Sequence, residues 1–401
     1  MADNGFRQLL AVAATAVVAA GVTGCSSHTA PPTATRAKAT VPQSLWQQQD
    51  LSALTGAPNA VLGGIASYVS QPDGGQHVLY VKVQGHIEDL WHDGTGWHHK
   101  DLSTAAGGAP PSRLDVSGYS FQSAQHAIYL GTDHHIQDLW WDQSGSHVED
   151  LTALTHSPLA TDAITGYGFE AQGTQHVVYF SWPDDHVHEL WSDRTGWHHT
   201  DMAAVLAAPP ADQGGHPAAY LFGGGQHVIY CGQDRHMHEL WSDAGGWHLG
   251  DVSAAAGAES SIGGFFTAYA FAAQGTQHVI YKSAPLEDIH LRELWWDHNG
   301  WHTDDLTAAV GAPGSPWSVS GYAFEAQGTQ HVIVDADHIV ELWSDRDGWH
   351  TDDLTTALGA PLSGGNGAVG YAFDAQGTQH VVYVGRNDRH IHELWWGPKA
   401  P

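Results

Sequence analysis

Basic residues are scarce in this sequence. Only 14 of its 401 residues are Lys or Arg, against 43 Asp and Glu, which gives a formal charge of −29. A surface of that charge repels phosphate groups, so nucleic acids and anionic membrane surfaces are poor partners. The 31 His residues make the charge depend on pH, because unperturbed imidazoles titrate near pH ~6.5.

Cysteine is nearly absent as well. Of its two copies, Cys231 follows Tyr230 at a strand position where other repeats carry aliphatic residues, which predicts a small core residue and not a reactive thiol. The other copy, Cys25, lies at the end of the N-terminal apolar run. If Cys25 is lipidated, no disulfide can form in the chain.

Long apolar runs are confined to the N-terminus. The run that begins at Leu9 has the length of a signal-peptide core and ends in Val22-Thr23-Gly24-Cys25, which resembles the bacterial lipobox. An ordinary secretory signal that ends near a cysteine is the alternative. We expect a signal peptide over 1–24 and a disordered tether rich in Ala, Thr and Pro over 25–44. The protein would then be lipid-anchored at Cys25 on the outer face of a bacterial envelope membrane, or secreted.

Motifs of catalysis and of cofactor binding are missing. The sequence has no Ser-His-Asp elbow, no Gly-rich phosphate loop and no metalloprotease motif. Glycoside cleavage needs two positioned carboxylates, but the acidic residues mostly recur at regular spacing. The exceptions Asp115, Asp162 and Glu259 have no partner visible in the sequence. We therefore predict no enzymatic activity and no cofactor.

The sequence is instead dominated by a repeat. A Gln-His pair followed by strand-forming residues recurs seven times at steps of 49 to 53 residues, and an acidic-Leu-Trp triplet follows each pair. A third motif, Trp-x-x-x-Asp-apolar, closes five of the blocks, and a version without Trp closes the second. The repeated histidines are His77, His126, His176, His227, His278, His331 and His380, and the triplets begin at Asp89, Asp138, Glu189, Glu239, Glu293, Glu341 and Glu393.

Each block contains four short segments with the alternation of β-strands, separated by turn residues. The last block ends at Trp396, after its third strand, and the repeat region begins at Trp46 with a lone fourth strand. Pairing these two would leave no sheet edge bare. The sequence therefore predicts an all-β fold, a seven-bladed β-propeller over 45–401, closed by an N-terminal strand that pairs beside the strand of Glu393.

The second and third strands resemble those of the fungal fucose-specific lectins and the related bacterial seven-bladed propeller lectins. In that family a basic residue pairs with a Glu on the next strand, before an aromatic-Asp turn, as in His227 to Tyr230 and Glu239 to Asp243 here. The resemblance implies sugar pockets between neighbouring blades, with the basic residue and the acid from one blade and the aromatic residues from the next.

Six pockets follow from this resemblance. They combine His126 and Asp138 with Trp197, His176 and Glu189 with Trp247, His227 and Glu239 with Trp296 and Trp301, His278 and Glu293 with Trp349, His331 and Glu341 with Trp396 and Trp46, and His380 and Glu393 with Trp97. A seventh, at His77 and Asp89, would face His147 in place of a Trp and should stay empty. The family's basic residue is usually Arg, whereas every copy here is His, which donates fewer hydrogen bonds.

The residue types suit a sugar. A carboxylate can accept two hydroxyl protons, and an indole face packs on the apolar C–H face of a pyranose. We therefore expect a lipoprotein that binds fucose-like or other glycans at several sites together. The alternative is an envelope scaffold that binds a protein partner and no sugar.

Structural interpretations of the same residues remain open. The first Trp of each triplet, such as Trp91, Trp140 and Trp191, is expected in the core, and the repeated His residues could be structural or ligand-facing. The His-x-His-Glu segment at His186 to Glu189 suggests a metal site, since alternate strand residues share a side. Its Glu points to the opposite face, however, so we predict no metal site.

Overall fold

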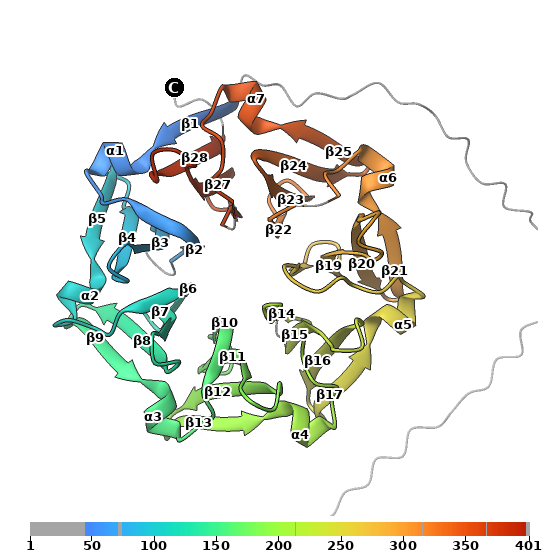
Figure 1. Cartoon of the computed structure of the whole chain (residues 1–401), viewed down its shortest axis with the longest axis horizontal. Coiled ribbons are helices and arrows are strands. Elements are labelled where there is room, and N and C mark those ends of the chain that lie inside the picture. Colours follow the sequence, from blue (N-terminus) through green and yellow to red (C-terminus); the bar gives the residue numbers. More distant parts are fainter. Residues whose placement is uncertain (1–44, 71–73, 213, 315, 366, 398–401) are drawn as a thin grey trace, which may run out of the picture. The chain divides into compact units, whose positions relative to one another are not determined.

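The chain folds into a ring of seven four-stranded antiparallel sheets, the blades of a β-propeller (Figure 1). This computed structural model describes residues 45–70, 74–212, 214–314, 316–365 and 367–397. The predicted all-β, seven-bladed fold is confirmed. The predicted signal peptide, Cys25 and almost all of the tether lie outside the described residues. Within the described ranges, no helix has the length and apolar character needed to cross a membrane.

The first four blades follow one another along the chain. Blade 1 contains β2 (Ala60–Val69), β3 (Gln76–Lys82), β4 (Ile87–His92) and β5 (Trp97–Asp101). Blade 2 contains β6 (Ser112–Phe121), β7 (Ala124–Gly131), β8 (Ile136–Asp142) and β9 (Gly145–Asp150). Blade 3 contains β10 (Ala160–Phe169), β11 (Thr174–Ser181), β12 (Val187–Asp193) and β13 (Gly196–Asp201). Blade 4 contains β14 (Ala218–Phe222), β15 (Gly225–Cys231), β16 (Met237–Asp243) and β17 (Gly246–Asp251).

The remaining three blades complete the ring. Blade 5 contains β18 (Thr267–Phe271), β19 (Thr276–Lys282), β20 (Leu291–Asp297) and β21 (Gly300–Asp305). Blade 6 contains β22 (Ser318–Phe324), β23 (Thr329–Ala336), β24 (His338–Asp345) and β25 (Gly348–Asp353). Blade 7 contains β26 (Val369–Phe373), β27 (Thr378–Val384), β28 (Ile391–Trp396) and, as its fourth strand, β1 (Trp46–Asp50).

Ring closure occurs as the sequence predicts. Strand β1 pairs antiparallel with β28, with Trp46 opposite Trp396 and Gln49 opposite Glu393. Trp46 is buried and belongs to the apolar cluster between blades 6 and 7. Strand β1 therefore supplies the fourth hydrogen-bonded strand of blade 7 and part of the core between blades 6 and 7.

The hydrophobic core is divided among the seven blade interfaces. Each of the seven clusters of buried residues draws side chains from two neighbouring blades. Close approach of the innermost strands explains the repeated Gly-Tyr pair. A Cβ on Gly118 would lie 2.7 Å from the ring of Tyr68, and one on Gly321 would lie 2.4 Å from the ring of Tyr269. At these two positions glycine lets the tyrosine of one blade pack against the backbone of the next.

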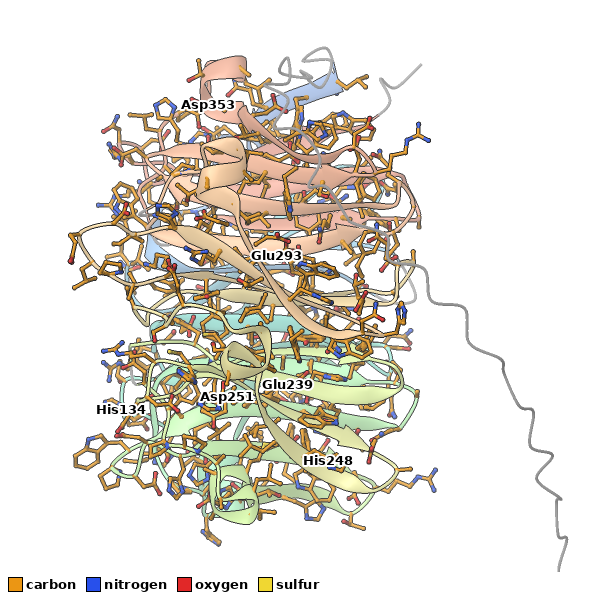
Figure 2. All side chains as sticks on the ribbon, turned by 90° about the vertical axis from the view of Figure 1, so that its right-hand side faces the viewer. His134, Glu239, His248, Asp251, Glu293 and Asp353 are labelled. Carbon is orange, nitrogen blue, oxygen red and sulfur yellow. The ribbon has the colours of Figure 1, made fainter. Side chains whose placement is uncertain are left out.

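Short helices that the sequence analysis did not predict mark the outer corners of the ring (Figure 1). They are α1 (Leu51–Thr55), α2 (Leu102–Ala105), α3 (Leu151–Thr155), α4 (Met202–Leu206), α5 (Val252–Ala256), α6 (Leu306–Val310) and α7 (Leu354–Leu358). The Asp of the third motif is the N-cap of each helix and accepts a hydrogen bond from the backbone N–H three residues later. Figure 2 shows one of these residues, Asp353, beside its helix.

The same aspartates hold the start of the third strands. A His before or at the start of each third strand places its Nδ1 2.6 to 2.9 Å from the capping carboxylate. The pairs are His86 with Asp101, His135 with Asp150, His186 with Asp201, His236 with Asp251, His290 with Asp305, His338 with Asp353, and His390 with Asp50. At each outer corner one carboxylate thus bonds both a backbone N–H of the helix and the imidazole of a histidine.

The closure predicts a sharp effect of truncation. Deleting residues 45–55 removes β1 and α1, which exposes the edge of β28 and opens the core between blades 6 and 7. We expect loss of the cooperative thermal transition and aggregation, measured by differential scanning calorimetry and size-exclusion chromatography. A chain that begins at residue 40 and keeps β1 is the control. If both chains melt alike, β1 does not hold the ring together.

The corners predict a stability maximum in mildly acidic solution. The hydrogen bond to Asp305 raises the pKa of His290. Burial works against the ionised form of Asp305, but hydrogen bonds from the Ala308 N–H and from His290 outweigh it and lower the pKa of Asp305. A His whose pKa is raised by folding stabilises the fold at pH values below its pKa in the unfolded chain, and this stabilisation is lost as the pH rises through its pKa in the folded protein. An Asp whose pKa is lowered by folding stabilises the fold at pH values above its pKa in the unfolded chain, and this stabilisation is lost as the pH falls through its pKa in the folded protein.

The two effects overlap between about pH 4 and pH 6.5, the unfolded values of Asp and His. A His290→Gln variant keeps a neutral donor at the corner. We expect the difference in Tm between parent and variant to be largest in this window, in thermal melts from pH 3 to pH 8. A difference that does not change with pH would contradict an ionic contribution of this pair.

Candidate functional site

A buried histidine and carboxylate lie side by side in every blade. The repeated second-strand His places its Nδ1 2.7 to 3.1 Å from the first residue of the acidic-Leu-Trp triplet on the third strand. All fourteen side chains belong to buried residues. Because an ionised carboxylate can only accept, Nδ1 donates and the imidazole holds the acid in one orientation. The pairing that the sequence predicts for His227 and Glu239 therefore recurs seven times.

Each of these histidines also stacks on the tyrosine of its innermost strand. The ring centroids are 4.9 to 5.3 Å apart, and the planes lie within 16° of each other. In five blades the tyrosine hydroxyl donates to the Gln side chain of the next blade, as Tyr220 does to Gln277 at 2.9 Å. The acid, the imidazole and the phenol thus connect two blades.

The second ring nitrogen divides the blades into two groups. In blades 3, 5, 6 and 7 a Thr two residues before the His lies 2.7 to 2.8 Å from Nε2. In those blades both ring nitrogens bond to protein, which makes the imidazole structural. Blades 1, 2 and 4 carry Gly75, Ala124 and Gly225 at the Thr position, so the threonine hydroxyl is lacking there.

The predicted tryptophans lie at the predicted interfaces. The tryptophans pack on the apolar clusters between blades 2 and 3 (Trp197), 3 and 4 (Trp247), 4 and 5 (Trp301), 5 and 6 (Trp349), 6 and 7 (Trp46 and Trp396) and 7 and 1 (Trp97). Each therefore shares an interface with its predicted His and acid. The same contacts fill the wedge between blades, so packing alone does not assign these residues a ligand.

The first Trp of each triplet is not in the core, contrary to expectation. In blades 1 to 6 this Trp is half-buried and stacks on a fourth-strand His, at 4.0 Å for Trp140 and His147 and at 5.2 Å for Trp241 and His248. It shares a strand face with the acid two residues earlier, and the Leu between them points to the opposite face.

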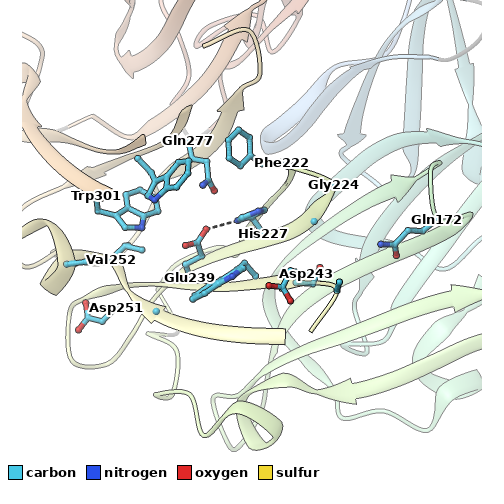
Figure 3. Close-up of a pocket in the computed structure, with 18 residues that line it drawn as sticks. Gln172, Phe222, Gly224, His227, Glu239, Asp243, Asp251, Val252, Gln277 and Trp301 are labelled. Atoms are coloured by element: carbon cyan, nitrogen blue, oxygen red, sulfur yellow. Dashed lines mark hydrogen bonds and ion pairs between the residues drawn. The ribbon is translucent and has the colours of Figure 1, made fainter. Parts of the chain in front are cut away.

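One interface opens into a pocket of about 840 Å³, between blades 4 and 5 (Figure 3). Its lining includes all four residues that the sequence groups there, which are His227, Glu239, Trp296 and Trp301. The ring of Phe222 lies between them, with its centroid 5.9 Å from His227 and 5.9 Å from Trp296. Sequence reasoning missed Phe222, although the repeated Gly-Tyr-x-Phe motif marks its position in other blades.

Two glycines stand where other blades carry side chains beside the His and the acid of this pocket. Gly225 replaces the Thr that covers the His in four other blades, and Gly250 lies opposite Glu239 in the register of β16 and β17. The other blades carry a side chain at the position of Gly250, which is Lys100, Glu149, Thr200, Asp304, Asp352 or Gln49. In blade 7 this side chain, Gln49, donates to the second carboxylate oxygen of Glu393. In blade 4 Gly250 brings no side chain to that place, and the ring of Trp241 lies 3.1 Å from the position that a Cβ would take.

The other interfaces are covered in different ways. The residue opposite the acid accepts the indole N–H of the first triplet Trp in blade 3 (Thr200), blade 5 (Asp304) and blade 6 (Asp352), at 2.8 to 3.1 Å. Burial raises the pKa of Glu149, which lies opposite Asp138 in blade 2. These side chains stand where a ligand of the acid would have to approach.

A second pocket, of about 590 Å³, lies between blades 1 and 2, where the sequence analysis predicts a pocket that stays empty of ligand. His77 and Asp89 line it, but the facing aromatic residue is Trp141, whose ring centroid lies 6.1 Å from that of His77. The predicted neighbour His147 stacks on Trp140 instead. Trp141 is the second Trp of the Trp-Trp pair in blade 2 and corresponds to Trp296 in blade 5. The sequence analysis missed it because it assigned the facing position to a fourth-strand residue.

No protein-family model matches the sequence, and neither does the sequence of any curated protein. Solved structures match the fold. The BP39L lectin from Burkholderia pseudomallei is 14% identical, with 85% of this chain and 98% of that chain covered at a TM-score of 0.62. AofleA from Arthrobotrys oligospora is 12% identical, with 77% and 90% covered at 0.50. The six-bladed lectin of Aleuria aurantia is 15% identical, with 74% and 96% covered at 0.49. The predicted resemblance to a bacterial propeller lectin is thus confirmed at the level of fold, and this chain shares the β-propeller architecture of BP39L.

Proposed function

We propose that this protein binds carbohydrate without cleaving it, and that the pocket between blades 4 and 5 is its principal site. The observation that carries the proposal is the lining of that pocket, which brings a buried carboxylate, an imidazole and two indoles from two blades around one open volume. The shared architecture with a protein named as a lectin supports it.

The chemistry of the pocket matches a neutral pyranose. His227 occupies one oxygen of Glu239, at 2.7 Å, and Gly250 leaves space beside the carboxylate for sugar hydroxyls. Hydrogen bonds to a carboxylate are charge-assisted, so two adjacent hydroxyls can be held strongly. Trp296 and Trp301 offer apolar surface for the C–H face of the ring. An anionic sugar would face Glu239, with no Lys or Arg among the lining residues, so we propose neutral sugars.

The same lining argues against hydrolysis. Cleavage needs a second carboxyl group free to act as acid, base or nucleophile. The other two acids of the pocket are committed to structure. Asp243 accepts from the Gly245 N–H at 2.6 Å and lies 2.8 Å from His248, whereas Asp251 caps α5 and bonds His236. Of the three acids, only Glu239 is buried in the pocket.

The sites differ around the ring. We propose the pocket between blades 1 and 2 as a second, weaker site, because its acid is the shorter Asp89 and Lys100 lines it. Ligand binding at the other five interfaces stays a prediction, since a side chain covers the acid in each. Two sites on one rigid ring already allow a glycan surface to be bound with avidity.

The N-terminal features complete the proposal. A lipid on Cys25 and a tether over 25–44 would anchor the propeller to the outer face of an envelope membrane, where glycans are accessible. The rival function, a scaffold that binds an envelope protein, would not require an open pocket that contains Glu239. Excess monosaccharide should release the bound partner if the protein binds glycans, and should not release it if the protein is a scaffold.

Substitutions at the pocket test the proposal directly. The purified protein should bind neutral glycans on an array, and Glu239→Gln should lower affinity about tenfold to a hundredfold, because a hydrogen bond to a charged group contributes ~1.5–3 kcal/mol. Trp301→Ala should lower it as well. Glu293→Gln, at the covered interface of blade 5, is the matched control and should bind like the parent. If no glycan binds at high protein density, the proposed lectin function is wrong, and the rival function as a scaffold for an envelope protein takes its place.

A second variant closes the pocket without touching its polar groups. Gly250→Thr introduces the residue that blade 3 has at this position, where Thr200 accepts from the Trp191 indole at 3.1 Å. The new Cβ would lie 3.1 Å from the ring of Trp241, a contact that a small shift accommodates. We expect unchanged Tm and a loss of glycan affinity of at least about tenfold, measured by titration calorimetry.

The reciprocal variant Thr200→Gly, in blade 3, should leave that affinity unchanged. Binding by Gly250→Thr at the affinity of the parent would show that the opening beside Glu239 is not where the ligand lies.

A further inference from the structure

Four potential metal ligands meet at one edge of blade 3. They are Asp184 and His186 in the loop between β11 and β12, His188 on β12, and Asp201 at the end of β13, and each offers a ligand atom within 4.8 Å of the others. The sequence analysis excluded a metal because Glu189 points to the opposite face, and it does bond His176 there. The two aspartates that replace it come from the loop and from the neighbouring strand.

One of these ligands is a buried nitrogen without a partner. The His188 side chain is 1% exposed, and its Nε2 has no hydrogen-bond partner in the structure. The nearest acid oxygen, on Asp184, is 3.8 Å away, too far for a hydrogen bond. An unpaired polar atom in the interior costs free energy. Nε2 belongs to a group of residues that includes two carboxylates but is bonded to neither of them, which is the arrangement of a metal ligand.

The rest of the His188 ring is held in place. Its Nδ1 lies 2.8 Å from Nε2 of His199, and its face stacks on Tyr179 at 5.4 Å. If Nδ1 carries the proton and donates to His199, Nε2 presents its lone pair to the cluster. A partner that fixes the second nitrogen of a histidine is a regular feature of metal sites.

In blades 4 and 7 the equivalent histidine nitrogen does have a hydrogen-bond partner. There His238 and His392 occupy the position of His188, and each places Nε2 3.0 Å from the loop aspartate, Asp234 or Asp388. In blade 3 the corresponding Asp184 is instead bonded by the hydroxyl of Ser181. Both other blades have glycine at the position of Ser181, namely Gly232 and Gly385, as the shared backbone hydrogen bonds show.

From this contrast we infer that blade 3 carries a binding site for a divalent transition-metal ion of the Zn²⁺ class, with Asp184, His186, His188 and Asp201 as its ligands. Two imidazoles and two carboxylates are a donor set that zinc takes in tetrahedral geometry, whereas Ca²⁺ and Mg²⁺ prefer oxygen ligands alone. The two carboxylates balance the charge of the ion.

The surroundings of the site already resemble an outer ligand shell. The Ser181 hydroxyl orients Asp184, the Ala204 N–H holds Oδ1 of Asp201 at 2.8 Å, and His199 orients His188. Binding requires His186 to give up its bond to Asp201, at 2.9 Å, and to turn its ring nitrogen lone pair to the ion. The bound ion would join the loop before β12 to the corner at α4.

Zinc titration of the purified full chain tests the inference. Isothermal calorimetry with ZnCl₂ alone should show one tight equivalent, and Zn²⁺ should raise Tm. His188→Gln and Asp184→Asn should each weaken this equivalent by more than about tenfold. Asp184 is in a partly exposed loop, so its variant keeps the test valid if His188→Gln misfolds. His238→Gln, at the equivalent position of blade 4, is the matched control and should keep the tight equivalent.

Cobalt gives a readout that does not depend on affinity. Co²⁺ in the parent should show the intense visible absorption of a tetrahedral site, and His188→Gln should abolish it while His238→Gln retains it. Zinc bound equally well by parent and His188→Gln, or lost equally in His188→Gln and His238→Gln, would assign the ion to surface histidines elsewhere and overturn the inference. No tight equivalent in the parent would overturn it as well.

Discussion

The hydrogen bond between a second-strand imidazole and a third-strand carboxylate is the interaction on which the rest of this structure depends. A carboxylate buried between blades is tolerated only if it is paired. The imidazole supplies the donor and then needs its own support, which it takes from the tyrosine stacked on it and, in four blades, from a threonine hydroxyl. The tyrosine in turn bonds the next blade, so the pairing of two strands also determines how neighbouring sheets are joined.

This arrangement explains why the architecture could be predicted from the sequence. The groups that hold a blade together are invariant in type along the repeat, so the count of blades and the closing partner of Trp46 follow from spacing alone. The outer helices were missed although their signal is present. The Asp of the third motif is the last residue of its strand, as predicted, and its second role as an N-cap becomes visible only with the hydrogen bond to the N–H three residues later.

The differences between interfaces were harder to predict for a physical reason. The residue opposite the acid differs from blade to blade, and that neighbour is defined by cross-strand register and not by spacing along the chain. Gly225 and Gly250 are visible departures from the repeat in the sequence, but only the pairing of Gly250 with Glu239 shows what they leave open. The same limitation concealed Trp141, and it concealed the meeting of Asp184 with Asp201, which lie on different elements.

A symmetrical framework therefore carries unequal sites because structure and function draw on different positions of one repeat. The His, the acid and the tyrosine are constrained by burial, and altering any of them disturbs the joint between two blades. The position opposite the acid, and the one two residues before the His, are free of that constraint, since seven blades with Lys, Glu, Thr, Gly, Asp or Gln opposite the acid adopt one backbone. We therefore expect substitution at these positions to change what an interface can bind while the ring stays closed. The two sites that we propose follow this rule, because in blade 4 a glycine lies opposite the acid and in blade 3 a serine bonds a loop aspartate.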